Sequence, residues 1–336
     1  MKPLSIAAMT FLLTSVAGCS LVSHEEEHPS QGVYQVELAS AKHFRHQANK
    51  LESEMLTFCE EGDLQQVQQQ WQQTMLSWMA LQGQERGPES ALEKSWNIQF
   101  WPDKKNTTGR KMAALINSEK HWNQDDIAQQ SVTVQGLGSI EWLLYDQDSP
   151  LKTSTRHCHV ATAIASNLAS NAALIASAWE ENPWSGLDEK VWISEYISLL
   201  SNQLEYSMKK MTRPLAKFGK PRPYFAESWR SGTSMKNLKA NITAMQTLYL
   251  SDGNGLDHTL RQNGHIQLAD SITRQFSSTL ETWPIDASLF ELLQTKEGYR
   301  VAYAQYNKLE QLKYLIHEEV AIKLGVVIGF NATDGD

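Results

Sequence analysis

Two short segments of the sequence carry the residues that could do chemistry, and the first covers 136–145. It reads GLGSIEWLLY and holds Glu141 among Leu, Ile and Trp side chains, on an expected short helix that is entered through glycines. An ionised carboxylate in such apolar surroundings needs an Arg, a metal ion or helix-terminal amides as its partner. The segment therefore indicates either a functional carboxylate or a structural salt bridge at Glu141, and the residues alone leave both open.

The second segment covers 228–237, where glycine and hydroxyl residues lead directly into an expected helix. Free backbone amides at a helix N-terminus, together with the Ser231 and Ser234 hydroxyls and the Arg230 guanidinium, suit an anion or a carboxylate. A plain N-terminal cap with an Arg salt bridge explains the same residues without a ligand. We take Glu141, Arg230, Ser231 and Ser234 as the candidate ligand-binding residues.

Other chemistry finds little support in the residue pattern. The sequence shows no nucleophile–base motif, no phosphate-binding loop, no zinc-finger spacing and no His-Glu-x-x-His. His157, Cys158 and His159 look like a ligand cluster, but helix residues two apart point in different directions. Eleven Trp residues invite a sugar-stacking hypothesis. Most of them, such as Trp71 and Trp78, stand at helical spacing among apolar neighbours, which core packing explains better.

The N-terminal residues have the pattern of a lipoprotein export signal. Lys2 supplies a positive charge, and 4–16 is an apolar stretch too short to span a bilayer as a mature helix. The stretch ends in Val-Ala-Gly-Cys19, which resembles a lipobox, so we expect cleavage after residue 18 and acylation of Cys19. Two or three acyl chains make a stable membrane anchor. Ser20 favours the outer membrane, facing the periplasm, because an Asp there would resemble an inner-membrane retention signal.

Residues 19–32 predict a flexible tether behind that anchor, because they are polar, acidic and without periodicity. The run from His24 to His28 could chelate a metal weakly, but a solvated linker has no packed frame to hold the ligands. The formal net charge of the chain is −8 at pH 7, and no block of Lys and Arg stands out. Nucleic acid is therefore not an expected partner.

The cysteines indicate one disulfide. Three occur in the sequence, and the lipobox uses the first. Cys59 and Cys158 remain, in a compartment that we expect to be oxidising, where a disulfide is the natural state of such a pair. Two unrelated buried thiols are the alternative. A disulfide would close a loop of about a hundred residues and would take the Cys158 thiolate away from any metal site.

Apolar residues repeat every three or four positions along most of the chain, which predicts an all-α fold. We expect long helices over 33–58, 63–82, 154–181, 187–212, 234–250, 265–282 and 297–323, and a shorter one over 138–146. A stretch with Pro and Gly at 182–186 divides these helices into two sets. The pattern therefore predicts two side-by-side four-helix-bundle domains, one over 33–182 and one over 187–336.

Several segments resemble the imelysin family, whose envelope proteins are also described as iron-regulated protein A-like and insulin-cleaving peptidase-like. The resemblance spans nearly all of the expected mature chain and rests on 58–59, 71–78, 87–88, 96–106, 229–231 and 324–336. The Trp-Pro-Asp stretch and the tail are its most specific parts. The resemblance implies an all-α fold of two bundles, a functional cleft between them that brings Glu141 and Arg230 together, and a role linked to iron uptake.

The hallmark of that family is Gly-x-His-x-x-Glu, in which the His and the Glu share a helix face and can hold one metal ion together. Here the motif falls on Gly136, Gly138 and Glu141, so a glycine stands at the His position. Glu141 remains as the one candidate ligand for a metal such as iron or zinc. A peptidase also needs a metal-bound water and a base, for which the sequence shows no replacement.

The sequence therefore predicts a binding lipoprotein without peptidase activity. Its ligand in the cleft would be a metal, a metal complex or a partner such as an iron-uptake component. A metallopeptidase with an atypical ligand set and a polysaccharide-binding lipoprotein with Trp platforms are the alternatives.

Overall fold

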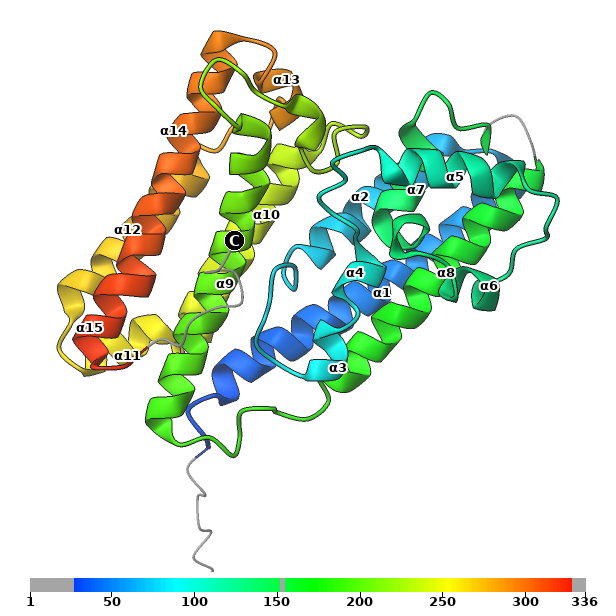
Figure 1. Ribbon diagram of the computed structural model, residues 1–336. Helices are drawn as coiled ribbons and strands as arrows, with labels where there is room; N and C mark the ends of the chain where they lie inside the picture. The colour runs from blue at the N-terminus through cyan, green and yellow to red at the C-terminus, as the bar shows by residue number, and fades with distance from the viewer. Residues whose placement is uncertain (1–26, 152–154, 328–336) are drawn as a thin grey trace, which may run out of the picture.

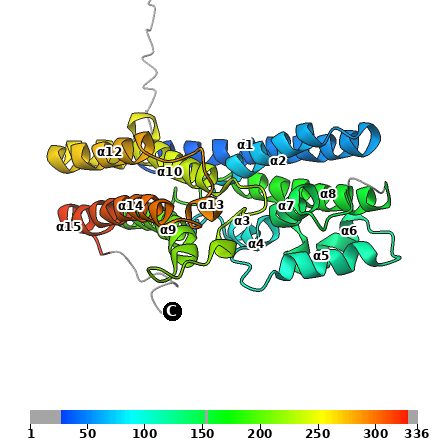
Figure 2. The same ribbon diagram turned by 90° about the horizontal axis from the view of Figure 1, so that it is seen from above.

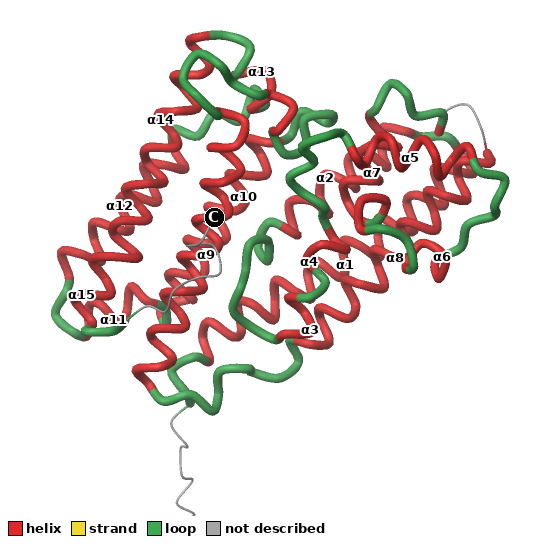
Figure 3. Tube along the Cα trace, viewed as in Figure 1, coloured by secondary structure: helices red, strands yellow, loops and turns green. Residues whose placement is uncertain are grey.

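Helices make up most of the protein in the computed structural model, which describes residues 27–151 and 155–327 (Figure 1). Within these two ranges no β-strand occurs, as Figure 3 shows, and the one isolated bridge joins Lys217 and Lys220. The predicted all-α fold is confirmed. The expected signal peptide, Cys19, His24 and the tail from residue 328 lie outside the described residues.

Four helices form the first set, which we call the N-terminal group. The longest, α1, packs along both α2 and α8, and α7 packs on α8 and α2. The bounds of the four are α1 (Gln31–Glu61), α2 (Leu64–Trp78), α7 (Gly136–Tyr145) and α8 (Thr155–Ala178). Short helices pack onto α7 and α8 from outside: α3 (Glu89–Leu92), α4 (Ser95–Ile98), α5 (Thr107–Asn117) and α6 (Gln124–Ala128).

The second set, the C-terminal group, is built around α9. This helix packs on α10 and α14, and α12 packs on both α10 and α14. Their bounds are α9 (Glu189–Leu215), α10 (Ser234–Leu250), α12 (Ile266–Glu281) and α14 (Lys296–Lys313). The group also contains α11 (Leu256–Gln262), α13 (Leu289–Leu292), a π-helical stretch (Tyr314–Glu319) and α15 (Val320–Leu324).

The two groups lie side by side, as Figures 1 and 2 show from two directions, with α10 against α1 and α2. This arrangement is consistent with the two expected bundles. The domain limits 33–182 and 187–336 stay predictions. Gln31 and Gly32, which we assigned to the tether, already belong to α1, and His28 is bound through Nε2 to the Leu187 carbonyl oxygen at 2.8 Å.

Helix α8 is the central helix of the N-terminal group. It is rich in alanine, so α1 can approach it closely, and Ala161, Ala165 and Ala172 are fully buried. Among the described helices, His157–Ala178 is the one long and apolar enough to cross a membrane, but 67% of that window is buried within the protein. A core helix meets the same test of length and composition, so the observation is weak evidence for a membrane span.

The predicted disulfide is confirmed. Cys59 in the last turn of α1 is bonded to Cys158 at the start of α8, with 5.7 Å between the Cα atoms. The chain leaves α1 at Gly62, whose φ of 84° lies in the left-handed region that glycine adopts without strain. The disulfide therefore joins two helices of the N-terminal group at the end where α1 turns into α2.

Two of the expected helices differ from the sequence prediction, one in where it ends and one in its geometry. The expected helix over 63–82 stops at Trp78. Beyond it the chain runs as a loop over 79–88, with Gly83 at a φ of 81° and against the Tyr206 side chain of α9. Tertiary contact with the other group has overridden helix propensity there. The expected helix over 297–323 is continuous along its path but changes to π-helical geometry at 314–319.

Candidate functional site

The site is built around the start of α7. The backbone conformation and close packing there allow only glycine at position 136. This residue has a φ of 67°, and a Cβ there would lie 2.4 Å and 2.2 Å from the carbonyl oxygens of Asn97 and Ile98. The close approach fixes the start of α7 against the end of α4. Glu141 stands on the second turn of α7 and is 5% exposed, so the carboxylate that we predicted on an apolar helix is buried.

Within the described residues, only one oxygen of the Glu141 carboxylate accepts hydrogen bonds. Its Oε1 accepts hydrogen bonds from the backbone N–H and from the Oγ of Ser231, both at 2.9 Å. Its Oε2 accepts no hydrogen bond from any residue in the described ranges. Burial raises the pKa of the Glu141 carboxyl, while Ser231 and the nearby charge of Arg230 act in the opposite direction. The structure thus places Ser231, one of the candidate residues, in direct contact with Glu141.

Arg230 lies next to Glu141 without pairing with it. Its Nε donates to Oδ2 of Asp146 at 2.6 Å, and its Nη2 donates to Oδ1 of Asn106 at 2.7 Å. The guanidinium also lies over the Trp229 ring, 4.4 Å from its centroid. Asp146, the residue that follows α7, is thus the direct partner of Arg230. Sequence reasoning missed Asp146, although its place at the end of the helix that carries Glu141 was a usable signal.

Glu141 and Arg230 nevertheless line the same cavity, which lies between α7 and the chain at 224–230 and measures about 40 Å³. Gly138 lines it too. A Cβ added at Gly138 would have the Phe100 carbonyl oxygen as its nearest neighbour, at 3.9 Å, so there is space for a side chain at the family's His position. A cavity of this size holds a small polar group or a few waters rather than a whole organic ligand.

Ser234 does not join this cavity. Its Oγ accepts a hydrogen bond from the backbone N–H of Leu289 at 2.7 Å, and the residue is buried. It therefore holds α13 against the start of α10. The structure brings together three of the four predicted residues, Glu141, Arg230 and Ser231, and places the fourth in a packing role.

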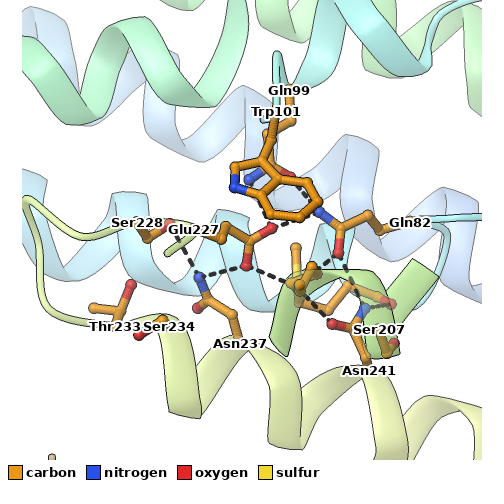
Figure 4. A network of polar contacts seen from close by, with 12 residues as sticks. Gln82, Gln99, Trp101, Ser207, Glu227, Ser228, Thr233, Ser234, Asn237 and Asn241 are labelled. Atoms are coloured by element: carbon orange, nitrogen blue, oxygen red, sulfur yellow. Dashed lines mark hydrogen bonds and ion pairs between the residues drawn. The ribbon is translucent and has the colours of Figure 1, made fainter. Parts of the chain in front are cut away.

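A second buried carboxylate, which sequence reasoning missed, also lines this cavity, and Figure 4 shows its polar contacts. Glu227 forms an ion pair with Lys210 of α9, with 2.7 Å between Oε2 and Nζ and both side chains almost fully buried. It also accepts from Gln82 at 2.7 Å and from Gln99 at 3.0 Å. Asn237 completes the set at 3.3 Å. Four donors therefore surround Glu227, two from each helix group.

Lys210 is as well bound as its partner. Its ammonium donates to Oε1 of Gln82 at 2.8 Å and to Oδ1 of Asn241 at 2.7 Å, as well as to Glu227. Burial lowers the pKa of Lys210, and the Glu227 carboxylate acts against that change. No pattern in the sequence marks this pair, since Lys210 stands in a charged run of α9 and Glu227 in a loop.

The residues present do not fit the metal ion that the family motif implies. In the part of the chain that the structure describes, no group of three His, Cys, Asp or Glu side chains could hold a metal. Gly138 offers no ligand atom, and Asp103, which also lines the cavity, accepts from the backbone N–H groups of Thr107 and Thr108. His159 lies against His121 with 4.5 Å between ring centroids, away from the cavity lining.

Comparison with known proteins identifies the family. The Imelysin family model (Peptidase_M75) matches residues 37–316, so this chain belongs to the imelysin family. A solved structure of an imelysin-like protein from Psychrobacter arcticum 273-4 has a TM-score of 0.74 and 20% sequence identity, covering 90% of this chain and 96% of that one.

A second solved structure, described as a putative iron-regulated protein A precursor from Parabacteroides distasonis ATCC 8503, has a TM-score of 0.65 and 15% identity. It covers 86% of this chain and 94% of that one. No curated protein matches the sequence. These likenesses establish the fold, and the sequence match establishes the family.

Proposed function

We propose that this chain is a non-peptidase binding protein of the bacterial cell envelope, linked to iron uptake, with the Glu141 cavity as its binding site. The observation that carries the proposal is the half-bound carboxylate: Glu141 keeps Oε2 unpaired at a cavity between two helix groups. This oxygen is accessible from the cavity, so a ligand with a donor group can reach it and form a charge-assisted hydrogen bond. The iron link rests on the description of the Parabacteroides relative.

The residues lining the cavity favour a metal ion that is already coordinated by other ligands, or a partner molecule, over a bare metal ion. One carboxylate oxygen at a cavity of about 40 Å³ can accept from a hydroxyl, an ammonium or a metal-bound water of a larger complex. The Arg230 side chain lines the same cavity and supplies positive charge for an anionic part. A metal complex or a partner protein with a donor group meets these requirements.

Hydrolysis finds no support in the same residues. A metallopeptidase needs a metal with an open position and a base for the attacking water. With Gly138 at the His position and Asp103 already accepting two backbone hydrogen bonds, the cavity lacks the ligands for such a metal. We therefore expect no chelator-sensitive cleavage of an unfolded protein substrate such as reduced casein.

Restoring the missing His tests this interpretation. In Gly138→His the new side chain shares a helix face with Glu141, so the variant should bind zinc more tightly than the wild type does, and Gly138→His/Glu141→Gln should lose that gain. The wild-type protein should carry no stoichiometric metal by elemental analysis after purification. Stoichiometric metal in the wild type that disappears in Glu141→Gln would contradict the proposal.

Ligand binding is tested by thermal unfolding of the chain from residue 20 onward. Ferric citrate serves as a probe for a metal complex, and zinc chloride as a probe for a bare ion. A ligand at ten times its Kd stabilises the folded state by about 1.4 kcal/mol. We expect ferric citrate to raise the Tm of the wild type, with little shift in Glu141→Gln. An equal shift in both proteins would place binding elsewhere.

The membrane anchor at Cys19 stays part of the proposal. The lipobox-like sequence supports it, and acylation would hold the protein at the outer membrane. Metabolic labelling with a fatty acid should mark the wild-type protein and leave Cys19→Ser unlabelled. Label retained in Cys19→Ser would exclude acylation at this residue as the anchor.

A further inference from the structure

A larger cavity lies on the other side of Gln99 and Trp101, and nothing in the Glu141 site explains it. It measures about 560 Å³ and lies between α9 and the chain that joins α2 to α4. In Figure 1 this chain runs along the side of the N-terminal group that faces α9. Its walls include four aromatic side chains, so we call it the aromatic cavity: Trp78, Trp96, Trp101 and Tyr206.

Packing contacts fix the positions of the aromatic side chains in the inner wall of the cavity. Trp101 is 7% exposed and contacts the Tyr206 ring edge-on, with 5.8 Å between centroids. Gly83 makes room for this contact, because a Cβ at its position would lie 2.5 Å from the Cβ of Tyr206. Trp96, on α4, is 52% exposed and forms the outer wall. Its ring contacts the Phe100 ring, with 5.8 Å between centroids, and the half of the indole left in solvent beside the cavity is a stacking surface.

Most polar groups of the aromatic cavity are already engaged. The indole N–H of Trp78 donates to Oε1 of Gln99 at 3.1 Å, and that of Trp101 donates to the Phe225 carbonyl oxygen at 3.2 Å. The amide of Gln82 is bound to Glu227 and Lys210. A sugar needs several hydrogen-bonding groups for its hydroxyls, and these residues have few to spare.

Two donors in the cavity do stay available. Arg86 makes no hydrogen bond within residues 27–151 and 155–327, and its one ion pair there, to Glu195, is long at 3.7 Å between Nε and Oε2. The Tyr206 hydroxyl likewise has no hydrogen-bond partner among the described residues. Burial raises the pKa of Tyr206, so its hydroxyl stays protonated and can donate. A guanidinium and a phenol O–H together suit an anion.

We propose that the aromatic cavity binds a planar aromatic carboxylate, with its ring against Trp96 and its carboxylate on Arg86. The flat indole surfaces match an aromatic ring, and the guanidinium matches a carboxylate in a two-pronged geometry. The inference goes beyond the Glu141 site, since neither Trp96 nor Arg86 lines that smaller cavity. The two cavities share Gln99 and Trp101 in their walls.

Isothermal titration of the full mature chain with 2-naphthoate tests the proposal. The neutral 2-naphthamide has the same ring system without the charge, so it should bind at least about tenfold more weakly. Trp96→Ala and Arg86→Gln should each weaken 2-naphthoate binding by about tenfold or more, because they remove the stacking surface and the cation. Both side chains are partly exposed, so we expect unchanged Tm values.

Two matched variants separate this site from its surroundings. Glu85→Gln removes a negative charge from the wall of the aromatic cavity, and Glu141→Gln removes the carboxylate of the smaller cavity. Glu85→Gln should bind 2-naphthoate at least as tightly as the wild type does, and Glu141→Gln should keep wild-type affinity. Absence of binding at millimolar 2-naphthoate, equal affinity for 2-naphthamide, or full binding by Arg86→Gln would each overturn the proposal. Loss of binding in Glu141→Gln alone would assign the ligand to the smaller cavity instead. Tight binding of glucose in place of 2-naphthoate would show a sugar site.

Discussion

Glu227 and Glu141 are two carboxylates at the same boundary between helix groups, and both line the small cavity. Glu227 is surrounded by Lys210 and three side-chain amides. Glu141 has Ser231 on one oxygen and nothing from the described chain on the other. The first has every requirement of a buried charge met from within the protein. The second leaves one oxygen free to accept a hydrogen bond from water or from a ligand.

This difference separates a carboxylate with a structural role, Glu227, from one that can still bind a ligand, Glu141. A buried ion pair whose hydrogen bonds are complete adds little net stability, but it fixes which partners meet. A half-bound carboxylate is tolerated where binding or catalysis uses it. Burial alone would have ranked the two residues equally, since Glu227 is 1% exposed and Glu141 5%. The hydrogen-bond partners tell them apart.

The largest expected effect comes from breaking the Glu227 set. Lys210→Met leaves a buried carboxylate without its cation, so the free energy of unfolding should fall by about 3–5 kcal/mol. Urea unfolding monitored by Trp fluorescence measures this change. The double variant Lys210→Met/Glu227→Gln removes both charges and should recover a large part of the loss. A fall of less than about 1 kcal/mol in Lys210→Met would mean that Glu227 is not a structural charge.

Glu37 extends the comparison to a buried carboxyl that forms no ion pair within the described part of the chain. Its Oε2 accepts from Nε2 of Gln84 at 2.6 Å, and burial raises its pKa from 4.5 to about 8. The unfolded chain therefore loses this proton at lower pH than the folded protein does. The contribution of Glu37 to stability is full below about pH 4.5 and is lost as pH rises to about 8, by up to about 1.4 kcal/mol per pH unit.

Glu37→Gln tests this linkage. The variant keeps an acceptor for Gln84 and has no proton to lose, so the difference in stability between variant and wild type should grow in favour of the variant from pH 5 to pH 8. Urea unfolding at several pH values measures that difference. A difference that stays constant across this range would show that Glu37 titrates with an ordinary pKa.

The smallest expected effect on stability is that of Glu141→Gln. The amide oxygen can still accept from Ser231, so the free energy of unfolding should change by less than about 1 kcal/mol. The same change should remove most of the stabilisation by ferric citrate. A large loss of stability would place Glu141 beside Glu227 as a structural charge and would remove the basis of the proposed binding site.

Much of the fold could be predicted from periodicity. The helix expected over 234–250 has those bounds, and the one expected over 265–282 is found at Ile266–Glu281. The short helices between α2 and α7 were not predicted, because pieces such as Glu89–Leu92 and Ser95–Ile98 are single turns that packing on α8 stabilises. Helix α5 was also missed, although it is eleven residues long.

The site was predictable only in part. Glu141 and Arg230 were predicted to share a cleft, and the structure places both on one cavity, but the direct partner of Arg230 is Asp146. Which hydroxyl meets Glu141 depends on the turn at 228–233, so Ser231 and Ser234 could not be told apart by type. The roles proposed for Arg86 and Trp96 could not be predicted from the sequence, because they depend on where the loop after α2 meets α9.

Contacts at three consecutive residues also constrain the length of the loop after α2. Gln82 hydrogen-bonds Glu227 of the C-terminal group, and Gln84 hydrogen-bonds Glu37 of α1, with Gly83 pressed against Tyr206 between them. Surface loops usually accept insertions, since their residues make few specific contacts. An extra residue among these three would shift one glutamine from its carboxylate whichever way the chain adjusted, so the segment from Gln82 to Gln84 should be among the parts of this protein least tolerant of a change in length.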